Sequence, residues 1–189
     1  MQQLLKEIRA CRVCEEHLPL GPRPIISATS KARILLVGQA PGTKVHASGI
    51  PWDDPSGKRL RSWLNMSDAD FYDPNKIAIV PMGFCYPGKG KSGDLPPRPE
   101  CAPIWHSKIT AELPNIKLTL LIGKYALDYY LGKGLKKNLT ETVKNFEAYL
   151  PQYLPLPHPS PRNQLWLKKN PWFEKDVIPS LQSTVHRMF

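Results

Sequence analysis

Three short apolar runs constrain this chain more than any other feature of its sequence. They are ARILLV at residues 32–37, KIAIVPM at 76–82 and KLTLLI at 117–122. Nearly continuous apolar residues over so few positions are typical of strands buried on both faces, as in a parallel sheet covered by helices. Because helical patterns lie between the runs, strands and helices alternate. We therefore predict an α/β fold, a three-layer α/β/α domain with a short, mainly parallel central sheet.

The remaining elements follow from periodicity and from proline. A weaker apolar run at residues 148–156 contains prolines, which limit it to an edge strand or to short pieces. Helices are expected at residues 3–10, 56–64, 103–113, 123–130 and about 171–186. No composition shift divides the chain, so residues 1–189 are expected to form a single domain.

Charge favours a polyanionic partner. The chain has 26 Lys and Arg against 16 Asp and Glu, a net charge of +10. Nucleic acid is the obvious partner, although many proteins are basic without functional reason. No run reaches the roughly 18 apolar residues of a membrane span. Charges at Lys6, Glu7 and Arg9 occupy the place of a signal peptide's apolar region, so we expect a cytoplasmic protein that does not enter membranes.

Four cysteines form two pairs. Cys11 and Cys14 are separated by two residues, and Cys85 and Cys101 by fifteen. In a cytosolic chain disulfides are disfavoured, and a CxxC pair is usually redox-active or metal-binding. Four thiolates that meet at one site suit either zinc or an iron–sulfur cluster, and the spacing does not decide between them. Four unrelated buried or free cysteines are the alternative.

Three loops follow predicted strands, where α/β proteins collect functional residues. They are GQAPG at 38–42, the 82–90 segment and HPSPRN at 158–163. Together with GIPWDDPSG at 49–57 and the cysteine pattern, they resemble the uracil-DNA glycosylase superfamily. The likeness runs from about residue 8 to 180 and is closest to the iron–sulfur-containing branches, families 4 and 5.

The resemblance implies a cofactor and a base pocket. Cys11, Cys14, Cys85 and Cys101 would hold a 4Fe-4S cluster, with zinc as the alternative, and so tie residues 1–24 to the 85–101 loop. Trp52 would stack on the base, although core packing explains a tryptophan equally well. The full set expected to bind the substrate is Gly38, Gln39, Ala40, Pro41, Gly42, Trp52, Met82 and Gly83.

Cleavage of a glycosidic bond places positive charge on the sugar and negative charge on the leaving base. By its motif, His158 would stabilise the base. Several branches carry an acid in the first motif, where this chain has Gln39 and Ala40. Asp54 resembles the family 5 acid that precedes Ser-Gly, and Asp53 is the substitute. The alternative for both acids is favourable electrostatics at a helix N-terminus.

The same resemblance implies DNA containing a damaged base as the partner. Contacts to DNA are expected from Ser160, Arg162, Asn163, Lys89 and Lys91. We expect a monomeric, nucleoid-associated, monofunctional glycosylase that leaves an abasic site, because no lysine stands out as a Schiff-base nucleophile.

Two features leave the substrate and the activity open. The family often carries an Asn before the third cysteine that reads the base, and residues 80–85 contain none. Uracil is the first expectation, and a deaminated purine such as hypoxanthine is an alternative. For the function, the alternatives to a glycosylase are a catalytically weak DNA-binding protein and a zinc-stabilised enzyme that acts on a nucleotide.

Overall fold

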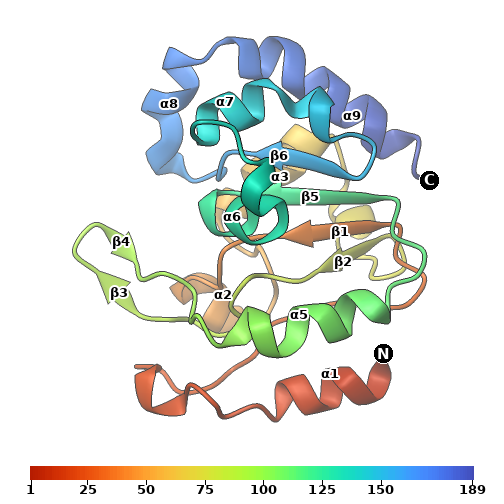
Figure 1. Ribbon diagram of the computed structural model, residues 1–189. Helices are drawn as coiled ribbons and strands as arrows, with labels where there is room; N and C mark the ends of the chain where they lie inside the picture. Colours follow the sequence, from red (N-terminus) through yellow and green to blue (C-terminus); the bar gives the residue numbers. More distant parts are fainter.

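A four-stranded sheet lies at the centre of the protein, whose computed structural model describes residues 1–189 (Figure 1). Its strands are β1 (Ile34–Val37), β2 (Ile77–Ile79), β5 (Leu118–Ile122) and β6 (Tyr153–Leu156), in the order β2-β1-β5-β6. Every neighbouring pair is parallel. The predicted parallel sheet is therefore confirmed, with the proline-containing strand β6 at one edge.

Alternate residues of each strand enter two separate cores. Ile34 and Leu36 of β1 belong to one core, whereas Leu35 and Val37 belong to the other. Burial on both faces explains why the strands read as continuous apolar runs. The predicted three layers are therefore confirmed, with a helical layer packed against each face of the sheet.

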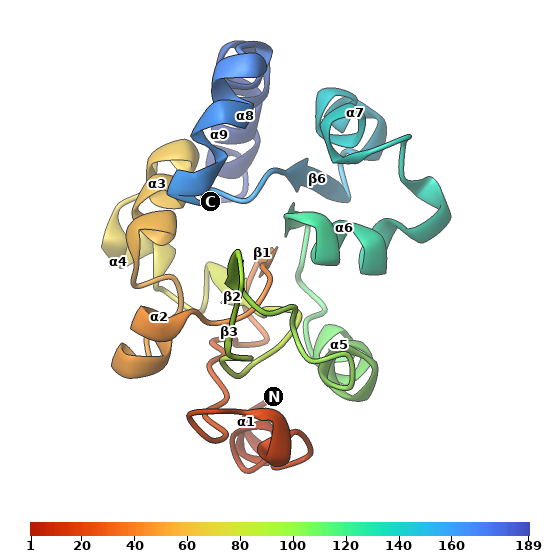
Figure 2. The same ribbon diagram turned by 90° about the vertical axis from the view of Figure 1, so that its left-hand side faces the viewer.

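The helices that form these layers surround the sheet (Figure 2). The first core takes side chains from α3 (Pro55–Leu64), α7 (Leu139–Lys144), a π-helix (Phe173–Val177) and α9 (Ile178–His186). The second takes them from α1 (Gln2–Arg9), α5 (Cys101–Ala111) and α6 (Lys124–Leu131). The first core also contains Phe71 of α4 (Asp68–Phe71), and the other α-helices are α2 (Thr43–Ser48) and α8 (Gln164–Lys169). No helix is long and apolar enough to cross a bilayer.

Two parts of the chain differ from the expectation. The run at 148–156 is a strand only at Tyr153–Leu156, because Phe146–Tyr149 forms a 3₁₀ turn before it. The loop between Cys85 and Cys101 contains a hairpin of β3 (Lys89–Gly90) and β4 (Gly93–Asp94). Each of its strands has only two residues, which is too few to show the alternation of apolar and polar residues that predicts a strand from sequence. It projects from the carboxyl-end side of the sheet (Figure 1).

Candidate functional site

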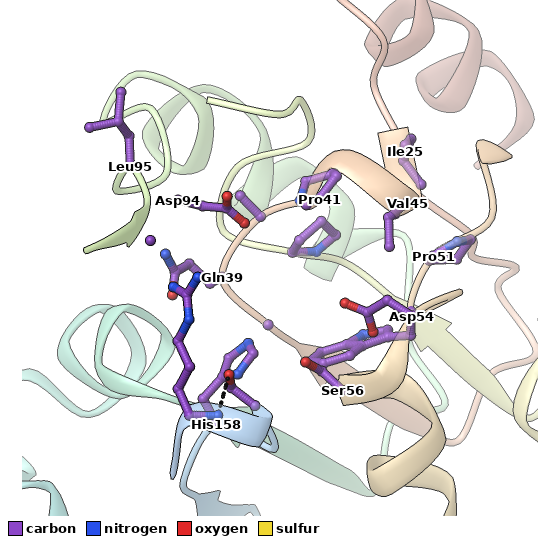
Figure 3. A pocket seen from close by; sticks show the side chains of 18 of the residues that line it. Ile25, Gln39, Pro41, Val45, Pro51, Asp54, Ser56, Asp94, Leu95 and His158 are labelled. Atoms are coloured by element: carbon purple, nitrogen blue, oxygen red, sulfur yellow. Dashed lines mark hydrogen bonds between the residues drawn. The ribbon is translucent and has the colours of Figure 1, made fainter. Parts of the chain in front are cut away.

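A cavity of about 380 Å³ lies where β1, β2 and β6 end. Its walls come from the GQAPG turn after β1, from Pro81 after β2, from the 51–56 segment, from the hairpin and from the HPSPRN loop after β6 (Figure 3). Five separate parts of the chain therefore form one pocket. Two of the three loops predicted at the strand ends, GQAPG and HPSPRN, contribute to it. No residue of the predicted 82–90 segment lines the pocket, and the hairpin contributes through residues 92–95 instead.

Trp52 is held in the pocket by an unusual backbone and two glycines. Its φ is +58°, in the left-handed region that few non-glycine residues adopt. A Cβ at Gly38 would lie 2.7 Å from the indole, and a Cβ at Gly57 would lie 1.7 Å from the Trp52 carbonyl oxygen. Both glycines are therefore required for the indole to lie over the end of β1.

His158 shares the pocket with Trp52. The two ring centroids are 5.7 Å apart at an interplanar angle of 32°. The Asn163 side-chain amide donates to the His158 carbonyl at 2.7 Å and so fixes the backbone of this loop. Burial lowers the pKa of His158, and the negative charge of Asp54 acts in the opposite direction. The imidazole is accordingly neutral near pH 7 and can donate from one ring nitrogen.

The structure separates the two candidate carboxylates. Asp54 lines the pocket, and its Oδ1 caps α3 by accepting from the Gly57 N–H at 2.7 Å. Asp53 is exposed and lies outside the lining. The pKa of the Tyr72 phenol is raised chiefly by burial and in part by the charge of Asp53, which places Asp53 on the Tyr72 side of its loop. Only Asp54 is near the other predicted catalytic residue, His158.

The first motif is fixed to the segment after β2. Met82 N–H donates to the Gly38 carbonyl at 2.9 Å, and Gly83 N–H donates to the Gln39 carbonyl at 3.0 Å. All five residues of GQAPG line the pocket, whereas Met82 and Gly83 do not. Their N–H groups are thus occupied in holding the turn, and the substrate-binding role predicted for the two residues stays a prediction. Pro81 takes the lining position instead.

The predicted DNA-binding residues lie around the rim. Ser160 and Arg162 line the pocket, and Arg162 Nη1 donates to the Ser92 carbonyl on the hairpin at 3.0 Å. Lys89 and Lys91 are exposed on the same hairpin. Asn163 differs from the others, because its side-chain amide holds the His158 carbonyl rather than facing solvent.

The four cysteines line a second, much smaller cavity of about 30 Å³. Phe84 N–H donates to Cys101 Sγ at 3.4 Å. Burial raises the pKa of Cys101 to about 12 and that of Cys85 to about 11, while a backbone hydrogen bond from Phe84 or Arg23 acts in the opposite direction on each. No three cysteine, histidine or acidic side chains are arranged to ligate a single ion. Backbone N–H groups aimed at sulfur fit thiolate ligands of an iron–sulfur cluster.

Sequence reasoning missed the pocket residues that the hairpin supplies. Ser92, Gly93, Asp94 and Leu95 all line the cavity. The available signal was Gly90-Lys91-Ser92-Gly93, in which two glycines flank a two-residue connection. Ser56 was also missed as a pocket residue; it is buried in the first turn of α3, whose N-cap is Asp54.

The fold and this site define a class of protein, a parallel α/β domain with a pocket of about 380 Å³ at the strand ends, lined by an aromatic, a histidine and a carboxylate. The family model described as the uracil DNA glycosylase superfamily matches residues 26–182. Because the match covers most of the chain, the protein belongs to this superfamily. The matched region begins after Cys11 and Cys14.

Proposed function

We propose that this protein is a monofunctional DNA glycosylase that hydrolyses the N-glycosidic bond of a deaminated base, uracil first, and leaves an abasic site. The observation that carries the proposal is the meeting of Trp52, Asp54 and His158 in one cavity at the strand ends. Superfamily membership supports the reaction class, and the three side chains account for its steps.

Each of these residues has a distinct role in the proposed reaction. A base that leaves the stack enters the pocket and stacks on the Trp52 indole. The neutral His158 donates a hydrogen bond to a base carbonyl as negative charge develops there. Asp54, held by its bond to Gly57, presents a carboxylate that stabilises the cationic sugar and orients water. Hydrolysis then places a water oxygen on the sugar and releases the base.

DNA would approach across the rim of the pocket. Lys89, Lys91 and Arg162 are exposed there, and the net charge of +10 favours a polyanion. One copy of the chain supplies every residue named, which supports action as a monomer. A cytoplasmic, nucleoid-associated location belongs to the same proposal, since the substrate is cellular DNA.

The proposal includes a 4Fe-4S cluster held by Cys11, Cys14, Cys85 and Cys101, as in the iron–sulfur branches of the superfamily. Support comes from the cavity that the four cysteines share and from the Phe84 N–H that donates to Cys101 Sγ. The cluster would supply cross-linking of residues 1–24 to the 85–101 loop, and none of the steps above passes through it.

A second candidate function is DNA binding with little turnover. Its support is that Gln39 and Ala40 leave the first motif without an acid, and that one oxygen of Asp54 is already engaged as a helix cap. Replacement of Asp54 by asparagine distinguishes the two roles, because asparagine is nearly as good an N-cap as aspartate. If Asp54 is only a cap, Asp54→Asn should change little, and if Asp54 is catalytic, base release should fall.

Base release from labelled oligonucleotides that contain uracil or hypoxanthine, in single and double strands, tests both candidates. We expect strand breaks only after alkali treatment. Asp54→Asn and His158→Gln should each lower base release by about 10² to 10³-fold while DNA binding persists. Asp53→Asn is the matched control and should stay close to the unsubstituted protein. Intact binding with no base release by the unsubstituted protein would favour the second candidate.

A further inference from the structure

A carboxylate that the proposed reaction does not use lines the base cavity. Asp94 of β4 lines the pocket beside Ser92 and Gly93 and is exposed to solvent. It takes part in none of the ion pairs of the protein. The hydrogen bond from Arg162 to the hairpin goes to the backbone carbonyl of Ser92 and leaves the Asp94 carboxylate unpaired. A negative group in a pocket that receives DNA requires an explanation.

Its position is opposite the catalytic residues. A Cβ at Gly42 would lie 3.3 Å from Asp94 Oδ2, so the carboxylate lies against the last glycine of GQAPG. Figure 3 shows Asp94 across the pocket from Asp54, Ser56 and His158, with Gln39 on the Asp94 side. A base whose glycosidic end lies near Asp54 therefore directs its far edge toward Asp94 and Gln39.

The hydrogen-bonding pattern of that edge changes on deamination. Cytosine and adenine carry an amino group next to a ring nitrogen with a lone pair. In uracil and hypoxanthine the amino group has become a carbonyl, and the ring nitrogen carries a hydrogen. An ionised carboxylate only accepts hydrogen bonds, whereas the glutamine amide also donates. Asp94 thus suits the ring N–H of the deaminated base and repels the lone pair of its parent.

We infer that Asp94 is a specificity-determining residue that distinguishes a deaminated base from its amino parent, with the Gln39 amide donating to the adjacent carbonyl. The substrate class is then the lactam bases uracil and hypoxanthine, and the inference rests on the proposed base-binding function of the pocket. Asp94 takes the base-reading task for which the chain has no asparagine at 80–85. The competing role is electrostatic support of the α2 N-terminus at Gly42.

The test measures binding rather than turnover. Oligonucleotides with a single 2′-fluoroarabino nucleotide resist glycosidic cleavage, and four are used, with uracil, cytosine, hypoxanthine or adenine. Dissociation constants are obtained by fluorescence anisotropy for the unsubstituted protein, Asp94→Asn and Asp94→Ala. Asp176→Asn is the matched control, because Asp176 is exposed on the π-helix away from the pocket. Base release by the unsubstituted protein is measured separately.

The unsubstituted protein and Asp176→Asn should prefer uracil over cytosine, and hypoxanthine over adenine, by at least about tenfold. Asp94→Asn and Asp94→Ala should each reduce both ratios by about tenfold or more, with little change in melting temperature. Unchanged ratios in Asp94→Asn, or a lowered melting temperature alone, would overturn the inference. A lactam preference without base release would leave the inference standing and contradict the glycosylase proposal. Base release without a lactam preference would overturn the inference about Asp94 and leave the glycosylase proposal standing.

Discussion

The base cavity and the cysteine cavity each take part of their lining from residues 81–101, and they differ in size and in the side chains that line them. The base cavity has about 380 Å³ and contains polar side chains such as Asp94. The cysteine cavity has about 30 Å³ and contains four half-buried thiols. Unpaired polar groups suit a ligand that enters and leaves, whereas four thiols around a small cavity suit a permanent occupant. Substitutions in the base cavity should therefore alter turnover, and substitutions in the cysteine cavity should alter stability.

Removal of one thiol should give the largest effect on stability. Cys101→Ser should lose the brown colour of the proposed cluster and lower the melting temperature by about 10 °C or more, because residues 1–24 and 85–101 lose their cross-link. Absorption spectroscopy, iron analysis and calorimetry measure these changes. Asp54→Asn, in the other cavity, is the matched control and should keep both colour and melting temperature. A stable, colourless Cys101→Ser protein that still releases base would show that the cysteine cavity does not determine stability.

Substitution of Gly57 should lower both the stability of the protein and its base release. An alanine near a helix N-terminus is ordinarily harmless, but here its Cβ would lie 1.7 Å from the Trp52 carbonyl oxygen. Gly57→Ala should therefore cost about 3 kcal/mol of stability and displace Trp52, so that base release falls as well. Chemical denaturation and tryptophan fluorescence report the two effects. Gly134→Ala is the control, since no atom lies within 4 Å of its Cβ position.

The Gly57 contact also shows how far the sequence alone can go. The apolar runs predicted β1, β2 and β5, because burial on both faces leaves a direct compositional signal. The motif residues Trp52, Asp54 and His158 were predicted to meet, and they line one cavity. The reason for the glycine of DDPSG was not predictable, since it depends on the left-handed Trp52 backbone packed against α3. Asp94 was missed because folding of the hairpin, rather than a motif, brings it to the pocket.

His106 contacts one lining residue of each cavity and should make the stability of the protein depend on pH. Its Nε2 lies 3.0 Å from the Pro81 carbonyl oxygen, beside the base cavity, and its ring stacks 5.9 Å from Phe84, which lines the cysteine cavity. Burial lowers the pKa of His106 to about 4. The unfolded chain therefore binds a proton more readily than the folded protein below about pH 6.5.

Stability should accordingly fall as the pH falls from 6.5 toward 4, by about 2 kcal/mol at pH 5 from this residue. Urea denaturation at pH 7.5 and pH 5 measures the difference. His106→Gln is expected to be less stable at both values and to show a smaller difference between them. His17→Gln, at an exposed histidine, provides the comparison and should keep the full difference. If His106→Gln loses as much stability between pH 7.5 and pH 5 as the unsubstituted protein, other histidines are responsible for the pH dependence.

The smallest expected effect belongs to the lysines of the hairpin, which lies in the chain between Cys85 and Cys101. Lys89 and Lys91 are exposed beside the pocket rim. If each contacts one phosphate, Lys89→Ala and Lys91→Ala should each lower the salt dependence of DNA binding by about 0.7 to 0.9 in the slope of log K against log salt concentration, without changing base preference. Fluorescence anisotropy over a salt series measures the slope. Lys133→Ala removes an exposed charge after α6 and should leave it unchanged. Equal losses in all three variants would assign DNA binding to net charge alone, whereas a loss confined to the hairpin would mean that the segment joining the cysteines also positions the DNA.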